Sequence, residues 1–269
     1  PTLLQDELAQ AKEEGRDPAI LEAIRKDAEA AGTDPAKWAL IWSRFAAVPP
    51  ARAFPYDEPD DLDAIRAKRI DGPRRLTLRD GDERLLDRLH GAWLGRAAGC
   101  TLGRPAEAFL DPATCPVLLT PRERIRSYLQ AVGPNEYPLN HYFPERSPGE
   151  ARTGGVAHPG SCRGKIANAE GGPEMRYGAV NQIVLAQRGV KFATADIART
   201  WLEYVPYRLA AAAEAMACRN LVARCEFHQG AVRGDEIDFR LVAARENPYR
   251  ESTGAAVRAD AWALAVPGW

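Results

Sequence analysis

The chain has 269 residues with 36 Lys and Arg against 37 Asp and Glu, so its formal charge is −1 and its isoelectric point is near 6.6. This near-neutral charge argues against bulk binding to nucleic acid, which requires clustered and uncompensated basic side chains. An apolar fraction of 45% and a charged fraction of 27% are ordinary for a globular protein and exclude wholesale disorder and a coiled-coil rod.

The first third of the chain is predicted to be helical. Apolar residues recur at helical spacing, and Asp34 followed by Pro35 is typical of an N-cap and the first residue of a helix. The expected elements are helices over about 3–11, 20–28 and 35–45, a Pro-rich linker over 48–61 and a short helix over 60–69. We interpret residues 1–80 as an N-terminal helical extension with its linker.

Residues 81–269 are predicted to form a helical domain with almost no strand signal, so the fold class is all-α. Thr120-Pro121-Arg122-Glu123 has the arrangement of a capping box. The expected helices run from Asp82 to a stop at Gly99, from Thr120 to Gly133, through Tyr177 to a stop at Gly189, from Thr194 onward, over 210–222 and over 252–264. Segment 133–172 is long, polar and rich in Gly and Pro, which favours a mobile lid.

Residues 87–109, DRLHGAWLGRAAGCTLGRPAEAF, combine small helical residues that allow close backbone approach with a turn that ends in a glutamate. The spacing of Leu-Gly, Ala-Gly, Leu-Gly, Pro and Glu resembles the opening motif of the ADP-ribosylglycohydrolase family. Further stretches resemble segments of that family in the same order, namely residues 57–76, 181–206, 211–222 and 247–268. The resemblance implies an orthogonal bundle of helices of the ADP-ribosylglycohydrolase type.

The resemblance also implies a metal site that this sequence departs from. Hydrolases of the family hold two metal ions, usually magnesium, because hard divalent cations need several oxygen ligands. Where family members carry Glu-Asp-Asp-Asp and then Tyr-Thr, this sequence reads EGGPEMRYG over 170–178, and Arg176 adds a positive charge. The later Ser-His…Asn-Gly and Asp-rich motifs are not in the sequence, which ends at Trp269. We therefore expect a diverged, C-terminally truncated member that needs no metal and no cofactor.

Three glutamates are the candidate catalytic residues. Glu107 matches the family glutamate that lies over the metal site; the alternative is an ancestral residue that now pairs with an arginine. Glu170 and Glu174 are the acidic residues left in the altered loop; the alternative is a pair of solvated carboxylates. The four histidines have no spacing typical of metal ligands, so we predict no zinc site.

Six further residues are candidate substrate-binding groups: Arg176, Tyr177, Tyr249, Arg250, Arg258 and Asp260. Tyr249 and Arg250 are candidates to hold a phosphate or carboxylate, because a guanidinium suits bidentate contacts with anions; structural packing is the alternative. Arg258 and Asp260 match the Arg-Ala-Asp segment of the family. Residues two apart do not share a helix face, so a structural role would give each of them another partner.

We weigh three hypotheses for function. The preferred one is an enzyme that acts without metal on a small polar or ribosylated metabolite by carboxylate acid–base chemistry. The alternatives are a glycohydrolase that retains cleavage of ADP-ribosyl or N-ribosyl bonds, and a catalytically inactive binder or regulator. We expect a cytoplasmic protein with reduced cysteines, no membrane or nucleic-acid partner, and a homodimer or a partner chain that completes the fold.

Overall fold

The computed structural model is all-α, apart from one short antiparallel ribbon of β1 (Phe227–His228) and β2 (Ala231–Val232). It describes residues 2–59, 61–75, 83–115, 117–169, 172–210, 212–224, 227–228, 231–232 and 237–267. The chain divides into two compact units. Unit 1 comprises Pro1–Arg75 and Val184–Ala256, and unit 2 comprises Leu76–Ile183 and Val257–Trp269.

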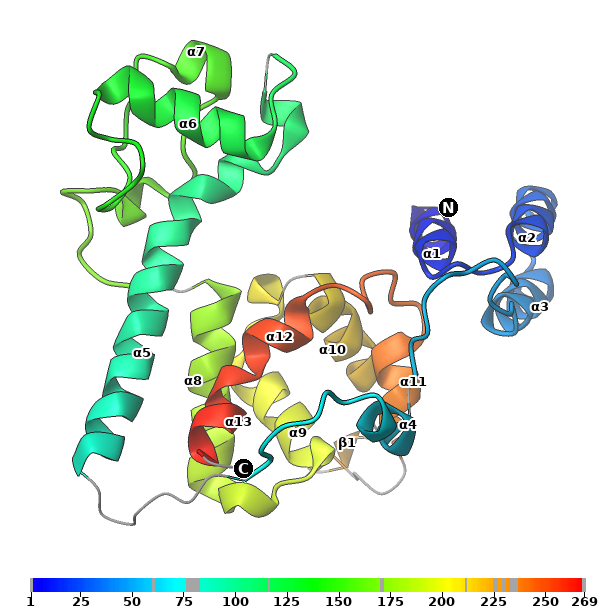
Figure 1. The fold of residues 1–269 in the computed structure, drawn as a ribbon. Helices are drawn as coiled ribbons and strands as arrows, with labels where there is room; N and C mark the ends of the chain where they lie inside the picture. The colour runs from blue at the N-terminus through cyan, green and yellow to red at the C-terminus, as the bar shows by residue number, and fades with distance from the viewer. Residues whose placement is uncertain are drawn as a thin grey trace. The chain divides into compact units, whose positions relative to one another are not determined.

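Unit 1 begins with three helices that share a core of their own: α1 (Thr2–Glu13), α2 (Pro18–Ala31) and α3 (Pro35–Ala46) (Figure 1). Asp17 and Asp34 cap α2 and α3, and each accepts hydrogen bonds from backbone N–H groups of the first helical turn. The core consists of Leu4, Ala11, Leu21, Ile24, Ala31, Ile41, Phe45 and Val48. These three predicted helices are confirmed.

Apart from the ribbon of β1 and β2, the remaining elements of unit 1 are helical. They are α4 (Leu62–Ala67), the end of α8, η4 (Gly189–Lys191), α9 (Thr194–Tyr204), η5 (Tyr207–Leu209), α10 (Ala212–Arg224) and α11 (Phe239–Ala244). Helices α9, α10 and α11 pack around Ala198, Leu221 and Val242. Helix α11 was not predicted, because six residues are too few to display a helical period.

Unit 2 begins with α5 (Glu83–Gly103), which continues past its predicted end. Gly99 is not among the described residues with a positive φ, so it continues the helix instead of ending it. The helix ends at Gly103, because Pro105 disfavours a helical backbone at the residue before it. A 3-10 turn, η1 (Arg104–Phe109), follows and carries Glu107. No described atom would lie within 4 Å of a Cβ added at Gly95 or Gly99, so the close approach expected there is not made.

Helix α6 (Pro121–Val132) has the predicted capping box, in which Thr120 and Glu123 exchange side-chain and backbone hydrogen bonds. Helix α6 packs against the short helix α7 (Glu150–Thr153) and against η1, and η1 in turn contacts η2 (Pro112–Thr114) and η3 (Pro159–Ser161). The core beneath consists of Phe109, Tyr128, Leu129 and Phe143.

The loop predicted to be a mobile lid is packed onto α6. Phe143 is 3% exposed, and Ser147 Oγ donates a hydrogen bond of 2.6 Å to the carbonyl of Tyr128. Buried aromatic and polar contacts of this kind hold a segment in place. We therefore describe residues 133–169 as a folded segment instead of a lid.

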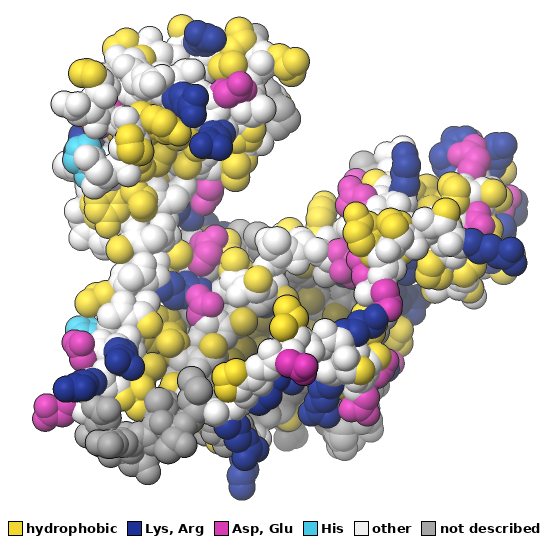
Figure 2. Space-filling model, in the orientation of Figure 1, with side chains coloured by type: hydrophobic (Ala, Val, Ile, Leu, Met, Phe, Trp, Pro, Cys, Tyr) yellow, Lys and Arg dark blue, Asp and Glu magenta, His cyan; other side chains and the backbone are white. Residues whose placement is uncertain are grey.

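Helix α8 (Pro173–Arg188) stops before Gly189 as predicted, and that glycine has a φ of +65°. The predicted helix over 252–264 is divided into α12 (Gly254–Arg258) and α13 (Asp260–Ala265). No helix among the described residues combines the length and apolarity needed to cross a bilayer. On the face that Figure 2 shows, basic and acidic side chains are intermingled.

Candidate active site

Glu107 of η1 lies in a cluster with a histidine and an arginine of unit 2. Its Oε2 is 3.3 Å from His158 Nε2, and its Oε1 is 4.0 Å from Arg104 Nη1. Arg104 Nη2 in turn lies 2.9 Å from His158 Nδ1. The Glu107 side chain is 47% exposed, whereas that of Arg104 is 11% exposed. A carboxylate, an imidazole and a guanidinium therefore meet where solvent still reaches the carboxylate.

The backbone at His158 has an uncommon conformation. Its φ of 47° and ψ of 68° place it in the left-handed region, which is unfavourable for a residue with a side chain. Such conformations cost on the order of 1–3 kcal/mol and gather at functional sites. The preceding N–H, that of Ala157, donates a 3.0 Å hydrogen bond to the carbonyl of Pro105 in η1. This contact places His158 beside Glu107.

Arg124 links the segment that carries Glu107 to the end of α7, which precedes His158 in the chain. Its side chain comes from α6 and is 1% exposed. Its guanidinium donates hydrogen bonds to Thr153 O (2.9 Å), Phe109 O (2.9 Å), Asp111 O (2.8 Å) and Thr114 Oγ1 (2.8 Å). Phe109 is the last residue of η1 and Thr153 is the last residue of α7. Asp111 directly precedes η2, and Thr114 ends it. Because a buried guanidinium is costly unless its donors are satisfied, Arg124 holds these segments in register.

Glu174 approaches the same cluster from the first turn of α8. A Cβ added at Gly172 would overlap both Arg104 Nη1 and Glu174 Oε2, so these two groups converge on the glycine. Glu174 Oε2 is buried and accepts no hydrogen bond from the described residues. The structure thus brings Glu174 close to Arg104, which contacts Glu107. Glu170, the third predicted catalytic residue, lies outside the described residues.

The Arg-Ala-Asp segment has separate partners for its two charges. The guanidinium of Arg258 lies 5.8 Å from the ring centroid of the buried Tyr177, and burial lowers the pKa of this arginine. Asp260 pairs with Arg96 of α5 at 2.6 Å. This arrangement matches the expectation that residues two apart need different partners. Arg176 lies in the first turns of α8, half-buried.

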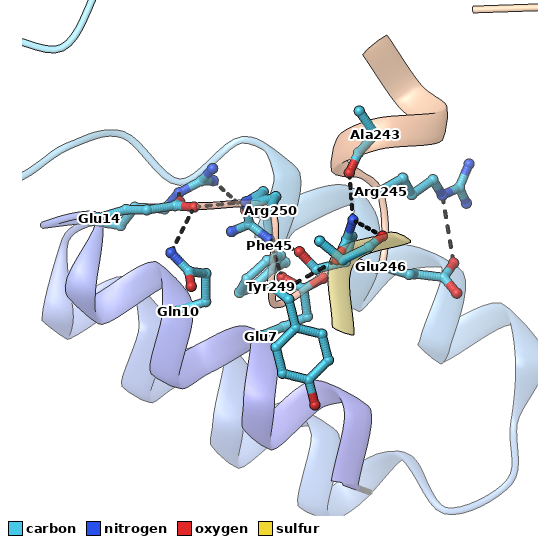
Figure 3. A network of polar contacts seen from close by, with 12 residues as sticks. Glu7, Gln10, Glu14, Phe45, Ala243, Arg245, Glu246, Tyr249 and Arg250 are labelled. Carbon is cyan, nitrogen blue, oxygen red and sulfur yellow. Dashed lines mark hydrogen bonds and ion pairs between the residues drawn. The ribbon is translucent and has the colours of Figure 1, made fainter. Parts of the chain in front are cut away.

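Tyr249 and Arg250 belong to unit 1, and Arg250 holds carboxylates of this chain (Figure 3). It pairs with Glu7 at 2.6 Å and with Glu14 at 2.7 Å, and Arg16 completes the network at 2.8 Å from Glu14. The Tyr249 ring is 42% exposed and points away from these ion pairs. Binding of a substrate anion by Arg250 stays a prediction, because internal glutamates take that position here.

The pKa values of the two carboxylates in this network are shifted in opposite directions. Burial is the largest influence on Glu7 and raises its pKa despite the hydrogen bond and charge of Arg250. Burial also acts on Glu14, but the hydrogen bonds and charges of Arg250 and Arg16 together outweigh it and lower the pKa.

Sequence reasoning missed His158, Arg104 and Arg124. The sequence offered one weak signal, the Gly-Gly-Val-Ala-His-Pro-Gly stretch over 154–160, because a histidine between turn-forming residues is a candidate for an unusual backbone. Only the folding of residues 133–169 onto α6 brings His158 to Glu107.

The described residues do not fit the two-metal centre that the resemblance implies. Among the described residues, no three side chains of His, Cys, Asp or Glu lie close enough together to hold a metal ion. The guanidinium of Arg104 lies 4.0 Å from Glu107 and converges with Glu174 on Gly172, so its charge would repel a cation there. We derive no step through a metal.

Comparisons with known proteins give no relative for this chain. No protein-family model matches it, and neither a curated protein nor a solved structure does so. The likeness to ADP-ribosylglycohydrolases therefore rests on the sequence motifs.

Proposed function

We propose that unit 2 carries a metal-independent acid–base site that acts on a small polar or ribosylated metabolite, in a diverged fold of the ADP-ribosylglycohydrolase type. The observation that carries the proposal is the contact of Glu107 with His158 and Arg104 on a strained backbone. Perturbed backbones and paired titratable groups are typical of sites that transfer protons.

Each residue of the cluster has a distinct task. Glu107, whose side chain is 47% exposed, is the proton acceptor or donor toward the substrate, and its Oε2 lies 3.3 Å from His158 Nε2. His158 is the partner with which Glu107 exchanges the proton, because its Nε2 lies within reach of Glu107 Oε2. Arg104 balances the negative charge of the ionised carboxylate and holds the imidazole in place. Glu174 is the second carboxylate of the site, and its Oε2 approaches Gly172 together with Arg104.

The substrate class follows from the family resemblance and from the charge of the cluster. A sugar hydroxyl or an N-ribosyl bond is polar and needs proton transfer at oxygen or nitrogen, which a carboxylate–imidazole pair supplies. Arg104 favours substrates that develop negative charge beside it.

The test is turnover of ADP-ribosylated arginine, NAD⁺ and ADP-ribose, followed by chromatography, with EDTA or magnesium present. Glu107→Gln and His158→Asn should each lower the rate by about 10²–10⁴-fold, the usual range for loss of a general acid or base. The rate of the unmodified protein should be the same in EDTA as in magnesium.

The chain provides a matched control in the same unit. Glu136, His141 and Arg163 form a second cluster of the same composition, with Arg163 3.1 Å from Glu136 Oε1 and 2.8 Å from His141 Nε2. Glu136→Gln and His141→Asn should leave turnover unchanged. Full activity of the Glu107 and His158 variants would overturn the proposal. Loss of activity in EDTA would favour a retained metal-dependent glycohydrolase, and a thermal shift with ADP-ribose but no product from any substrate would favour an inactive binder.

A further inference from the structure

A cavity of about 690 Å³ lies in unit 1 between the end of α9 and one face of α10. These two helices pack side by side (Figure 1). Cys218 and Val222 are one helical turn apart on α10 and so face the cavity together. The volume falls in the range of about 300–1,000 Å³ that is usual for sites of small molecules.

The cavity is predominantly apolar. Val205 and Cys218 form a buried floor at 6% and 4% exposure. Burial raises the pKa of the Cys218 thiol, which keeps the floor uncharged at neutral pH. Tyr204, Tyr207 and Val222 form an exposed rim at 42%, 59% and 54%. Such a floor and rim suit a ligand with an apolar or aromatic body.

Among the described residues of the cavity lining, one side chain is basic, that of Arg219, and its ion pair is weak. Arg219 Nη2 lies 3.4 Å from Glu246 Oε2, longer than the roughly 2.7–2.9 Å of a strong charge-assisted hydrogen bond. Glu246 also contacts Arg245 at 3.6 Å and has a left-handed backbone with a φ of 50°. An incoming anion can therefore replace Glu246 at Arg219 and leave Glu246 beside Arg245.

The second charged side chain of the lining selects the charge of the ligand. Glu203 is an acidic member of the same lining, so the cavity is formally neutral with Arg219. A dianion such as a phosphate monoester would be repelled by Glu203 more strongly than a monoanion. A single carboxylate matches the planar fork of one guanidinium and carries only one negative charge toward Glu203.

We propose that this cavity binds a small carboxylic acid with an apolar or aromatic body, whose carboxylate pairs with Arg219 and whose body lies over Val205, Cys218 and Val222. The site is in unit 1, whereas the Glu107 cluster is in unit 2, so this proposal stands independently of the proposed function.

The test compares three probes that differ only in the head group: 4-phenylbutyrate, 4-phenylbutan-1-ol and 4-phenylbutylammonium. Calorimetric titration of the unmodified chain should give the highest affinity for the carboxylate, at least five-fold above the alcohol, and the lowest for the ammonium. Arg219→Gln should lower the affinity for 4-phenylbutyrate about ten-fold, to that of the alcohol, because it removes a charge-assisted hydrogen bond. Affinity for the alcohol should not change.

Two further variants separate the site from general effects. Ala223→Trp places a large ring in the cavity lining and should abolish binding of all three probes. Arg208 of η5 is exposed and is not part of the lining, so Arg208→Gln should leave every affinity unchanged. Equal affinity for acid and alcohol, no binding at millimolar concentration, or an equal loss with Arg208→Gln would overturn the proposal. The series of probes on the unmodified chain decides the matter even if a variant fails to fold.

Discussion

Replacing Glu7 with alanine should destabilise the folded chain through its effect on Arg250. The Glu7 side chain is 1% exposed and that of Arg250 is 11% exposed, so both charges are removed from solvent. Loss of one partner from a buried ion pair costs about 3–5 kcal/mol, because the other charge stays buried without compensation. Glu14 still faces Arg250 at 2.7 Å, so we expect the lower end, about 3 kcal/mol.

Glu7→Gln should cost much less, below about 1 kcal/mol, because glutamine still accepts a hydrogen bond from Arg250. The raised pKa of Glu7 also means that the folded site tolerates the uncharged carboxyl better than the unfolded chain does. The free energy of unfolding is measured by urea denaturation with circular dichroism. Hydrogen exchange of the α1 amides shows whether the loss is local to unit 1.

The pH dependence provides a second test, with opposite signs for the two glutamates. Glu7 binds its proton more tightly in the folded state than in the unfolded chain, so the free energy of unfolding falls as Glu7 ionises above pH 4.5. Glutamine does not ionise, so the loss of stability caused by Glu7→Gln should become smaller as pH rises. Glu14 has a lowered pKa, so its stabilisation is complete above 4.5 and is lost as pH falls through the folded-state value. Glu14→Gln should therefore show a deficit that shrinks below 4.5. Equal losses for Glu7→Ala and Glu7→Gln, or the same pH trend for Glu7→Gln and Glu14→Gln, would refute this reasoning.

Three other substitutions test the framework around the candidate active site. Thr120→Ala removes the capping box of α6 and should lower the free energy of unfolding by about 1 kcal/mol in urea denaturation. Arg124→Met leaves four oxygen acceptors without their donor, and should cost more than about 3 kcal/mol by the same measurement. Gly172→Ala introduces a Cβ that overlaps Arg104 and Glu174, so turnover should fall toward that of Glu107→Gln. Unchanged turnover in Gly172→Ala would show that the position of Arg104 does not matter to the reaction.

Local signals predicted the elements whose ends are set by neighbouring residues. Asp34 with Pro35 and the capping box of Thr120 act within one helical turn, so the starts of α3 and α6 could be read from the sequence. Gly99 misled the prediction, because a glycine ends a helix only when its backbone turns left-handed. The break between α12 and α13 at Ala259 was not visible either, because Arg258 and Asp260 have partners distant in the sequence.

The candidate site was also predictable only in part, because contacts between residues distant in the sequence assemble it. Glu107 and Glu174 came from the family resemblance, and the structure brings both of them to Arg104. His158 joins them because its loop, which carries no periodic signal, packs onto α6. The buried Arg124 stabilises this packing through hydrogen bonds to three backbone carbonyls and one hydroxyl. Carbonyl acceptors leave no trace in the sequence, since every residue has one.

Burial distinguishes the charged clusters that stabilise this protein from the one suited to chemistry. Arg124 and Glu7 are each 1% exposed. Arg124 makes four hydrogen bonds and Glu7 forms an ion pair with Arg250, so a substrate has no access to them. Glu107 is 47% exposed while its arginine partner is enclosed. A group that exchanges protons with a ligand must reach solvent on one side and be held on the other. Glu107 meets both conditions, because its side chain reaches solvent while His158 and the enclosed Arg104 lie against it.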